Sequence, residues 1–196
     1  AVALAVVTRT HRAAILRMDW PELKTAVSGC TACRLHETRT RTVFGVGDEE
    51  ADWLLVGAGP GAEEDRMGEP FVGQAGKLLD NLLAAVSLKR GQNVYIATTV
   101  KCRPPGNRNP EPEEVAACEP YLTRQIALIR PKLIIALGKV AAQRLLETDH
   151  SIASLRGKLH QCQGVPLIVT YHPAYLLRSL PDKAKAWEDL LLARRT

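Results

Sequence analysis

Four cysteines have a spacing that suits a shared inorganic ligand. Cys30 and Cys33 form a C-x-x-C pair, Cys102 lies in the run Lys-Cys-Arg-Pro-Pro, and Cys118 follows after fifteen residues. Four thiolates can bind zinc or an iron–sulfur cluster, which would join the N-terminal part of the chain to its middle. Alternatively they are separate reduced thiols, because free cysteine often behaves as a small buried apolar residue. The polar, proline-rich surroundings of both pairs favour the shared ligand, and Cys162 is expected to be an ordinary thiol.

A glycine-rich loop follows a strand predicted at residues 53–56. Its sequence at 57–62, Gly-Ala-Gly-Pro-Gly-Ala, fits a loose form of the dinucleotide-binding pattern. However, acids follow directly at 63–65, where a pyrophosphate would need bare helix amides. The acid that should bind a ribose about twenty residues later is represented only by Asp80, inside a predicted helix. The loop therefore indicates close approach of the backbone to a flat or anionic ligand, with a flavin or nicotinamide cofactor as the alternative.

Two further segments contain residues suited to ligand binding. Phe71 lies in the loop sequence Glu-Pro-Phe-Val-Gly, so it is either a satellite of the core or a stacking surface for a base. His172 follows the apolar run 165–169 and is expected at a strand end, although an isolated histidine is more often structural. The leucines and arginine at 176–178 are either core residues with a surface charge, or an apolar wedge beside a phosphate-binding group.

The hydrophobic pattern predicts strands that alternate with helices. Helices are predicted at about 19–28, 75–87, 112–130, 139–147 and 181–196, and strands at 53–56, 94–100, 132–137 and 165–170. Such alternation is typical of the α/β class, with a mainly parallel sheet covered on both faces. In these sheets ligands bind beyond the carboxyl ends of the strands. The segments 57–65, 98–103 and 171–178 are therefore expected to converge on one cleft.

Length, charge and composition limit the class of protein. The chain has 196 residues, of which 46% are hydrophobic, a formal net charge of +5 and a pI of about 9.1. The basic charge favours a polyanionic partner such as nucleic acid. No apolar run approaches the length of a membrane span, so we expect no membrane partner. The cysteine content suits a reducing cytosol.

The N-terminal residues differ in composition from the rest. Residues 1–17 contain three arginines and no acid. They are expected to form a flexible basic arm, or to precede a natural start at Met18. We therefore divide the chain into an arm at 1–18 and a single domain at 19–196.

Four stretches together resemble the iron–sulfur uracil-DNA glycosylases, the family-four branch of that superfamily. They are Cys-Thr-Ala-Cys at 30–33; Gly-Ala-Gly-Pro-Gly at 57–61, running through the acids to Gly-Glu-Pro-Phe-Val-Gly at 68–73; Lys-Cys-Arg-Pro-Pro at 101–105 with Asn-Arg-Asn-Pro at 107–110; and His-Pro-Ala-Tyr-Leu-Leu-Arg at 172–178. Their order and spacing match, and the similarity covers about residues 19–195. The resemblance implies a three-layer α/β/α fold, a four-iron four-sulfur cluster on Cys30, Cys33, Cys102 and Cys118, and repair of deaminated cytosine in DNA.

The same resemblance implies a mechanism for a cytoplasmic, monomeric enzyme. The uracil nucleotide is turned out of single- or double-stranded DNA, and its N-glycosidic bond is hydrolysed. His172 would donate a hydrogen bond to the leaving base. Glu64 would orient water, unless the acids at 63–65 are simply a solvated helix start. The implied uracil contacts are Ala58, Gly59, Pro60, Phe71, Thr98 and His172, and the implied DNA contacts are Arg103, Arg108, Leu176, Leu177 and Arg178.

Two positions depart from the family pattern. Ala58 stands where the family usually has an acid, and Thr98 where it usually has Asn, whose side chain offers a donor and an acceptor side by side. Loss of a matched hydrogen-bond pair weakens recognition of a base. Three hypotheses follow: a glycosylase with weakened or altered base selectivity, a catalytically impaired iron–sulfur DNA-binding protein, and a flavin or nicotinamide oxidoreductase.

Overall fold

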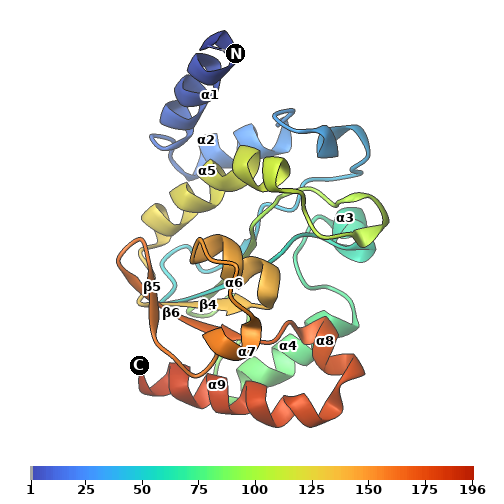
Figure 1. Ribbon diagram of the computed structural model, residues 1–196, viewed down its shortest axis with the longest axis vertical. Coiled ribbons are helices and arrows are strands. Elements are labelled where there is room, and N and C mark those ends of the chain that lie inside the picture. The colour runs from blue at the N-terminus through green and yellow to red at the C-terminus, as the bar shows by residue number, and fades with distance from the viewer. Residues whose placement is uncertain (1) are drawn as a thin grey trace.

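The computed structural model describes the backbone of residues 2–196 and the side chains of residues 9–196. Within them, six strands form one sheet in the order β1-β3-β2-β4-β6-β5 (Figure 1). The strands are β1 (Val46–Gly47), β2 (Trp53–Gly57), β3 (Val94–Thr98), β4 (Leu133–Leu137), β5 (His160–Cys162) and β6 (Val165–Thr170). The four central strands run parallel, which confirms the predicted sheet. The antiparallel edges β1 and β5 were not predicted, because two or three residues are too few to show a period.

Helices follow or precede each of the central strands. They are α1 (Val2–Ile15), α2 (Trp20–Ser28), α3 (Ala62–Met67), α4 (Gln74–Ala85), α5 (Pro112–Ile129), α6 (Lys139–Leu145), α7 (Ile152–Leu155), α8 (Pro173–Arg178) and α9 (Lys183–Arg195), with short 3₁₀ turns η1 (Arg34–Glu37), η2 (Pro105–Asn107) and η3 (Leu180–Asp182). The short helices α3, α7 and α8 were not predicted as separate elements. Among the described helices, none combines the length and apolar character needed to cross a membrane.

The two faces of the sheet bury alternate residues of the same strands. Leu54 and Val56 of β2 pack with α5, α6 and α7 on one face, whereas Leu55 packs with α4 and α9 on the other. This alternation follows from the two-residue period of a strand. Figure 1 shows α5 above the strands and α4 and α9 below them. The three-layer α/β/α arrangement is therefore confirmed.

The N-terminal segment, expected as a flexible arm, is helical in residues 2–15. Its end is attached to the rest of the chain, because Ile15 is fully buried and the Arg12 side chain pairs with Glu119 of α5. The sequence could not show this attachment, since it depends on a distant helix. The division of the chain at residue 18 stays a prediction, and Ile15 and Arg12 make contacts across it.

Candidate active site and thiol site

A cavity of about 560 Å³ lies at the carboxyl ends of the parallel strands. It brings together the segments after β2, β3 and β6 that the sequence placed at one cleft, and adds the segment after β4. Its lining includes Ala58, Gly59, Pro60, Gly61, Glu64, Phe71, Thr98, Asn107, Arg108, Gly138, Lys139, His172 and Arg178. All the residues predicted to bind or process a base therefore lie around one hollow.

Phe71 and His172 face each other within this cavity. Their ring centroids are 5.3 Å apart, with an angle of 35° between the planes. Phe71 has a φ of 52°, which is rare for a bulky residue and costs of order 1–3 kcal/mol. The conformation is held from outside: Arg90 donates a hydrogen bond of 2.7 Å to the Phe71 carbonyl, and a Cβ on Gly76 would lie 1.9 Å from that oxygen. A strained and well-supported aromatic ring at a cavity is typical of a ligand-binding site.

The tautomer of His172 is fixed by the start of α8. His172 is the N-cap residue, and its Nδ1 accepts a hydrogen bond of 3.0 Å from the Ala174 amide. The hydrogen of the neutral ring must then be on Nε2. Burial, helped by the positive charge of Arg178, lowers the pKa of His172 to about 4. At neutral pH the site therefore has an uncharged imidazole with one N–H to donate.

A glycine beside His172 allows this close packing. Gly138 follows β4 with a φ of 93°, and a Cβ added there would lie 2.9 Å from the Cβ of His172. Any side chain at this position would push the histidine out of place. The ends of β4 and β6 are therefore fitted to each other at the cavity.

The acidic run at 63–65 divides into three different environments. Glu63 is exposed and pairs with Arg66 at 2.7 Å. Asp65 is buried and accepts backbone hydrogen bonds from Thr40 (2.8 Å) and Arg41 (3.3 Å), so it fixes a loop. Glu64 lines the cavity, where its Oε1 accepts a hydrogen bond of 3.3 Å from the amide of Val72. Glu64 is thus the carboxylate of the run that is available to a ligand.

Thr98 is buried and its side chain is already engaged. The Thr98 hydroxyl donates a hydrogen bond of 2.6 Å to the Val100 carbonyl, and its own carbonyl accepts one of 2.9 Å from the Lys101 ammonium. The hydroxyl therefore offers the cavity only an acceptor. Ala58 follows the neighbouring strand, and its side chain is only a methyl group. Its carbonyl accepts hydrogen bonds from the Thr99 hydroxyl and the Val100 amide.

The four predicted cysteines lie around a second, small cavity. It is lined by Cys30, Cys33, Cys102 and Cys118, together with Arg39, Lys101 and Tyr121. Arg39 and the Lys101 amide donate hydrogen bonds of 3.3 Å to the sulfurs of Cys102 and Cys118. Burial raises the pKa of the Cys33 and Cys102 thiols, and that of Cys118 to about 12. Cys162 lies elsewhere, in β5, as expected for an ordinary thiol.

These four thiols, gathered around one cavity, form a donor set of the kind that binds an iron–sulfur cluster. Among the described side chains, no three His, Cys, Asp or Glu residues form a group that could hold one metal ion. The N–H donors aimed at two of the sulfurs are also typical of iron–sulfur sites.

Comparison with known proteins identifies the family of this chain. The uracil DNA glycosylase superfamily matches residues 44–191. The chain belongs to this superfamily. Among its relatives, the type-4 uracil-DNA glycosylase of Archaeoglobus fulgidus is 46% identical over 77% of this chain and 79% of its own length. Those of Thermotoga maritima and Pyrobaculum aerophilum are 47% and 40% identical, over 81% and 89% of this chain and 83% and 93% of their own lengths.

The two leucines of α8 that were predicted to contact DNA differ in their exposure to solvent. Leu176, predicted to contact DNA, is fully buried against Tyr171 and Ala186, so that prediction is wrong. Leu177 is 42% exposed and is available to a partner. The reason is helical phase: neighbouring residues on a helix point about 100° apart, and only one of the two leucines faces solvent.

The three arginines predicted to contact DNA lie in different settings. Arg178 and Arg108 line the cavity, and Arg108 also pairs with Glu114 at 2.7 Å. Arg103 does not line the cavity, and its Nε donates a hydrogen bond of 2.6 Å to Asn107 of η2. The prediction that Arg103 contacts DNA stays untested. In the structure, its hydrogen bond to Asn107 links two residues of the same loop.

Lys139 also lines the strand-end cavity, and it was not predicted from the sequence. It is exposed at the rim, at the first position of α6. A signal was present, because Gly138 ends a predicted strand at the same edge of the sheet as the other cavity segments. Applying the strand-end rule to this fourth strand would have found Lys139.

Proposed function

We propose that this chain excises uracil from DNA by hydrolysing the N-glycosidic bond of deaminated cytosine. The observation that carries the proposal is the facing pair of Phe71 and His172 in the strand-end cavity of a uracil DNA glycosylase superfamily member. The type-4 relatives carry that activity in their names. We further propose that residues 19–196 act as one domain, as a monomer, on both single- and double-stranded DNA.

The cavity is suited to a base that has left the stack. The glycosidic bond is inaccessible inside a duplex, so the nucleotide must first be turned outwards. Phe71 provides an aromatic surface on which the pyrimidine ring stacks. The backbone of residues 58–60 lines the same hollow and is placed to contact the edge of the base.

His172 supplies the main electrostatic contribution in the proposed reaction. As the C1′–N1 bond breaks, its electron pair moves to uracil and the sugar becomes cation-like. The neutral imidazole donates its Nε2 hydrogen towards the uracil oxygen that becomes negative. Because the ring is buried and held by the Ala174 amide, little reorganisation accompanies this hydrogen bond. A water molecule oriented by Glu64 adds to C1′ and releases one proton to the solvent, from which the departing uracil anion is protonated, and this completes hydrolysis.

The four thiols would hold a four-iron four-sulfur cluster. The four cysteines line one small cavity, and N–H donors reach the sulfurs of Cys102 and Cys118, which supports that assignment. When bound, the cluster supplies a cross-link between the N-terminal segment and α5. One of its four ligands, Cys102, lies directly before the loop at 103–110, which borders the base cavity through Asn107 and Arg108. We therefore assign it a structural role.

The rim of the cavity is suited to a DNA backbone. Arg108, Lys139 and Arg178 surround its mouth, and the chain has a net charge of +5. Such cations contact phosphates without reading sequence. Leu177, exposed beside Arg178, is placed to fill the space that the extruded base leaves in the stack.

A second candidate function follows from Ala58 and Thr98. The Thr98 hydroxyl donates its hydrogen to the Val100 carbonyl, so it has none to donate to a base. The Ala58 side chain is a methyl group without a hydrogen-bonding atom. Neither position therefore offers uracil the polar group that the family usually has there. This observation favours weakened or altered base selectivity, and in the limit an iron–sulfur protein that binds DNA without excising uracil. The two candidates differ in turnover, not in DNA affinity.

A single-turnover excision assay tests the proposal. Protein whose iron and labile sulfide have been quantified is mixed with uracil-containing single- and double-stranded oligonucleotides, and abasic product is measured. We expect excision by the wild type, a loss of about 10²–10³-fold in His172→Ala, and no loss in His150→Ala, an exposed histidine outside the cavity. DNA affinity should stay the same in all three. Tight DNA binding with no product from the intact protein would overturn uracil excision and establish the second candidate.

A further inference from the structure

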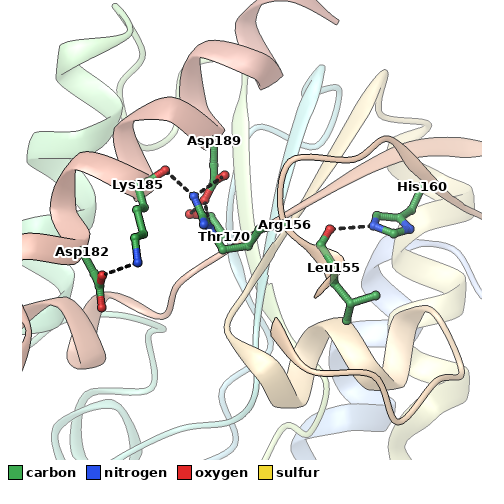
Figure 2. Close-up of polar contacts among 7 residues, drawn as sticks. All are labelled: Leu155, Arg156, His160, Thr170, Asp182, Lys185 and Asp189. Carbon is green, nitrogen blue, oxygen red and sulfur yellow. Dashed lines mark hydrogen bonds and ion pairs between the residues drawn. The ribbon is translucent and has the colours of Figure 1, made fainter. Parts of the chain in front are cut away.

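A buried ion pair lies behind the strand that carries His172. Arg156, which follows α7, forms a two-pronged pair with Asp189 of α9, with hydrogen bonds of 2.8 and 3.0 Å (Figure 2). The Asp189 side chain is 2% exposed and that of Arg156 14%. Asp189 also accepts a hydrogen bond of 2.7 Å from the hydroxyl of Thr170, the last residue of β6. The ion pair is therefore hydrogen-bonded to β6 at Thr170, two residues before His172.

The same arginine also holds the next residue of the chain. Its guanidinium carbon lies 4.9 Å from the centroid of the Tyr171 ring. Tyr171 also stacks on Tyr175 of α8, with centroids 5.0 Å apart and planes 24° apart. Thr170 and Tyr171 are thus both fixed by Arg156 and Asp189, and His172 follows directly.

The contacts close into a ring around the start of α8. The Tyr175 hydroxyl donates to Asp182, and Asp182 pairs with the Lys185 ammonium at 3.1 Å. The Lys185 carbonyl in turn accepts a hydrogen bond of 2.9 Å from Arg156, as Figure 2 shows. The α7 end is anchored as well, because His160 of β5 donates to the Leu155 carbonyl at 2.8 Å. Elements far apart in sequence therefore converge on the segment before the histidine.

The energetics of the pair suggest a role in geometry. Burial of two charges costs several kcal/mol of desolvation, and well-packed apolar residues of similar volume often serve stability as well or better. What apolar residues lack is direction: the planar guanidinium fixes Asp189 at two points and lies against one face of Tyr171. Catalytic groups need such directional support, because a misplacement of about 1 Å can cost about 10²-fold in rate.

We propose that Arg156 and Asp189 are positioning residues, which hold the His172 imidazole against the base through Thr170 and Tyr171. The pair touches neither the cavity nor a base. It fixes the backbone from which the histidine projects, and the ring of contacts prevents α8 from turning. The proposal rests on the proposed function for its catalytic consequence, but the placement of the His172 ring can be measured separately.

The test uses variants that remove the pair without leaving a lone buried charge. Arg156→Met with Asp189→Leu replaces both charges by apolar groups, and Thr170→Val removes only the hydroxyl that links the pair to β6. Lys24→Met on α2, which removes an exposed ion pair with Glu49, is the matched control. Each protein is characterised by single-turnover excision at several DNA concentrations, by urea unfolding, and by the ¹⁵N chemical shifts of the His172 ring.

We expect the double variant to lose about 10²-fold in the maximal rate, with half-saturating DNA concentration unchanged and stability close to wild type. Thr170→Val should lose less, and Lys24→Met nothing. The His172 Nε2–H signal should shift or broaden in the first two variants only. An unchanged rate and an unchanged His172 spectrum in the double variant would overturn the proposal, as would a rate that falls only in proportion to stability. If wild type excises no uracil, the proposed function fails, and the His172 spectra still decide the positioning role.

Discussion

The ammonium group of Lys101 donates a hydrogen bond of 2.9 Å to the backbone carbonyl of Thr98. Lys101 is fully buried, and its amide donates to the Cys118 sulfur, so one residue touches both the thiol site and the strand end at the base cavity. Its ammonium has a second acceptor, Gln125 Oε1, at 2.7 Å. Burial lowers its pKa to about 8, although the thiols of Cys118 and Cys102 act against that shift.

We predict that Lys101→Met destabilises the protein. The substitution leaves the Thr98 carbonyl and the Gln125 amide oxygen buried without a donor, which costs about 1–3 kcal/mol each. The free energy of unfolding, measured in urea, should fall by about 2–6 kcal/mol relative to wild type, the sum of the two costs. Lys24→Met, in an exposed pair, is the control and should change little. Equal stability of the two variants would contradict the assigned contacts.

The neighbouring acids Glu63 and Glu64 form a matched pair for testing water orientation. Glu64 faces the cavity, whereas Glu63 is exposed and bonded to Arg66. Glu64→Gln keeps the shape of the side chain but removes the carboxylate, and we expect the single-turnover rate to fall by about 10²-fold. Glu63→Gln should leave the rate unchanged. Similar rates in both variants would remove Glu64 from the mechanism.

The leucines of α8 should respond to truncation in opposite ways. Leu176→Ala creates a cavity beside Tyr171, and we expect it to lower the free energy of unfolding by about 2–5 kcal/mol. Leu177→Ala removes an exposed side chain, so stability should hold while base extrusion weakens. Fluorescence of 2-aminopurine placed next to uracil reports that extrusion. A normal extrusion signal in Leu177→Ala would exclude it as the wedge.

The sequence predicted the layers, the strand-end cleft and the gathering of the four thiols, because these follow from periodicity and spacing. It could not assign the acids at 63–65, or choose between Leu176 and Leu177. Both decisions depend on the phase of a short helix against the core, and α3 and α8 are too short to show it in their pattern. Burial of one residue and exposure of the next is a property of packing, not of residue type.

The support behind His172 was also beyond prediction. Arg156, Thr170 and Asp189 are separated by 14 to 33 positions in sequence and meet only when α7, β6 and α9 pack. Nor does the sequence indicate that Phe71 adopts a positive φ, since the Arg90 and Gly76 contacts that hold it come from other segments. Such groups are recognised by geometry, and each residue alone has an ordinary surface or core interpretation.

The pocket substitutions lead to a prediction of gained activity. Thr98→Asn with Ala58→Glu restores the groups that the family usually has, and the Asn amide can pair with the edge of uracil. We expect uracil excision per unit of enzyme to rise by about 10-fold or more, with DNA affinity unchanged. Competition with oligonucleotides carrying other deaminated bases shows whether selectivity narrows. A slower double variant with intact fold would mean that this cavity recognises a base in its own way.

The pKa of His172 predicts how stability depends on pH. Its folded value of about 4 lies below the unfolded value of about 6.5, so between those values the unfolded chain binds the proton and the folded chain does not. Above pH 6.5 the ring is neutral in both states and does not lower the free energy of unfolding. As pH falls from about 6.5 towards 4, the unfolded chain gains a proton that the folded chain does not, and the free energy of unfolding decreases.

His172→Gln isolates this effect, because glutamine is uncharged and does not titrate. Between pH 7 and pH 5 we expect the wild type to lose about 2 kcal/mol more unfolding free energy in urea than the variant. Over the same range the wild-type excision rate should not show titration of His172, since the folded ring stays neutral and keeps its Nε2 hydrogen. Parallel stability curves for the two proteins, or an excision rate that follows a pKa near 6.5, would mean that the ring is solvated and free to become charged.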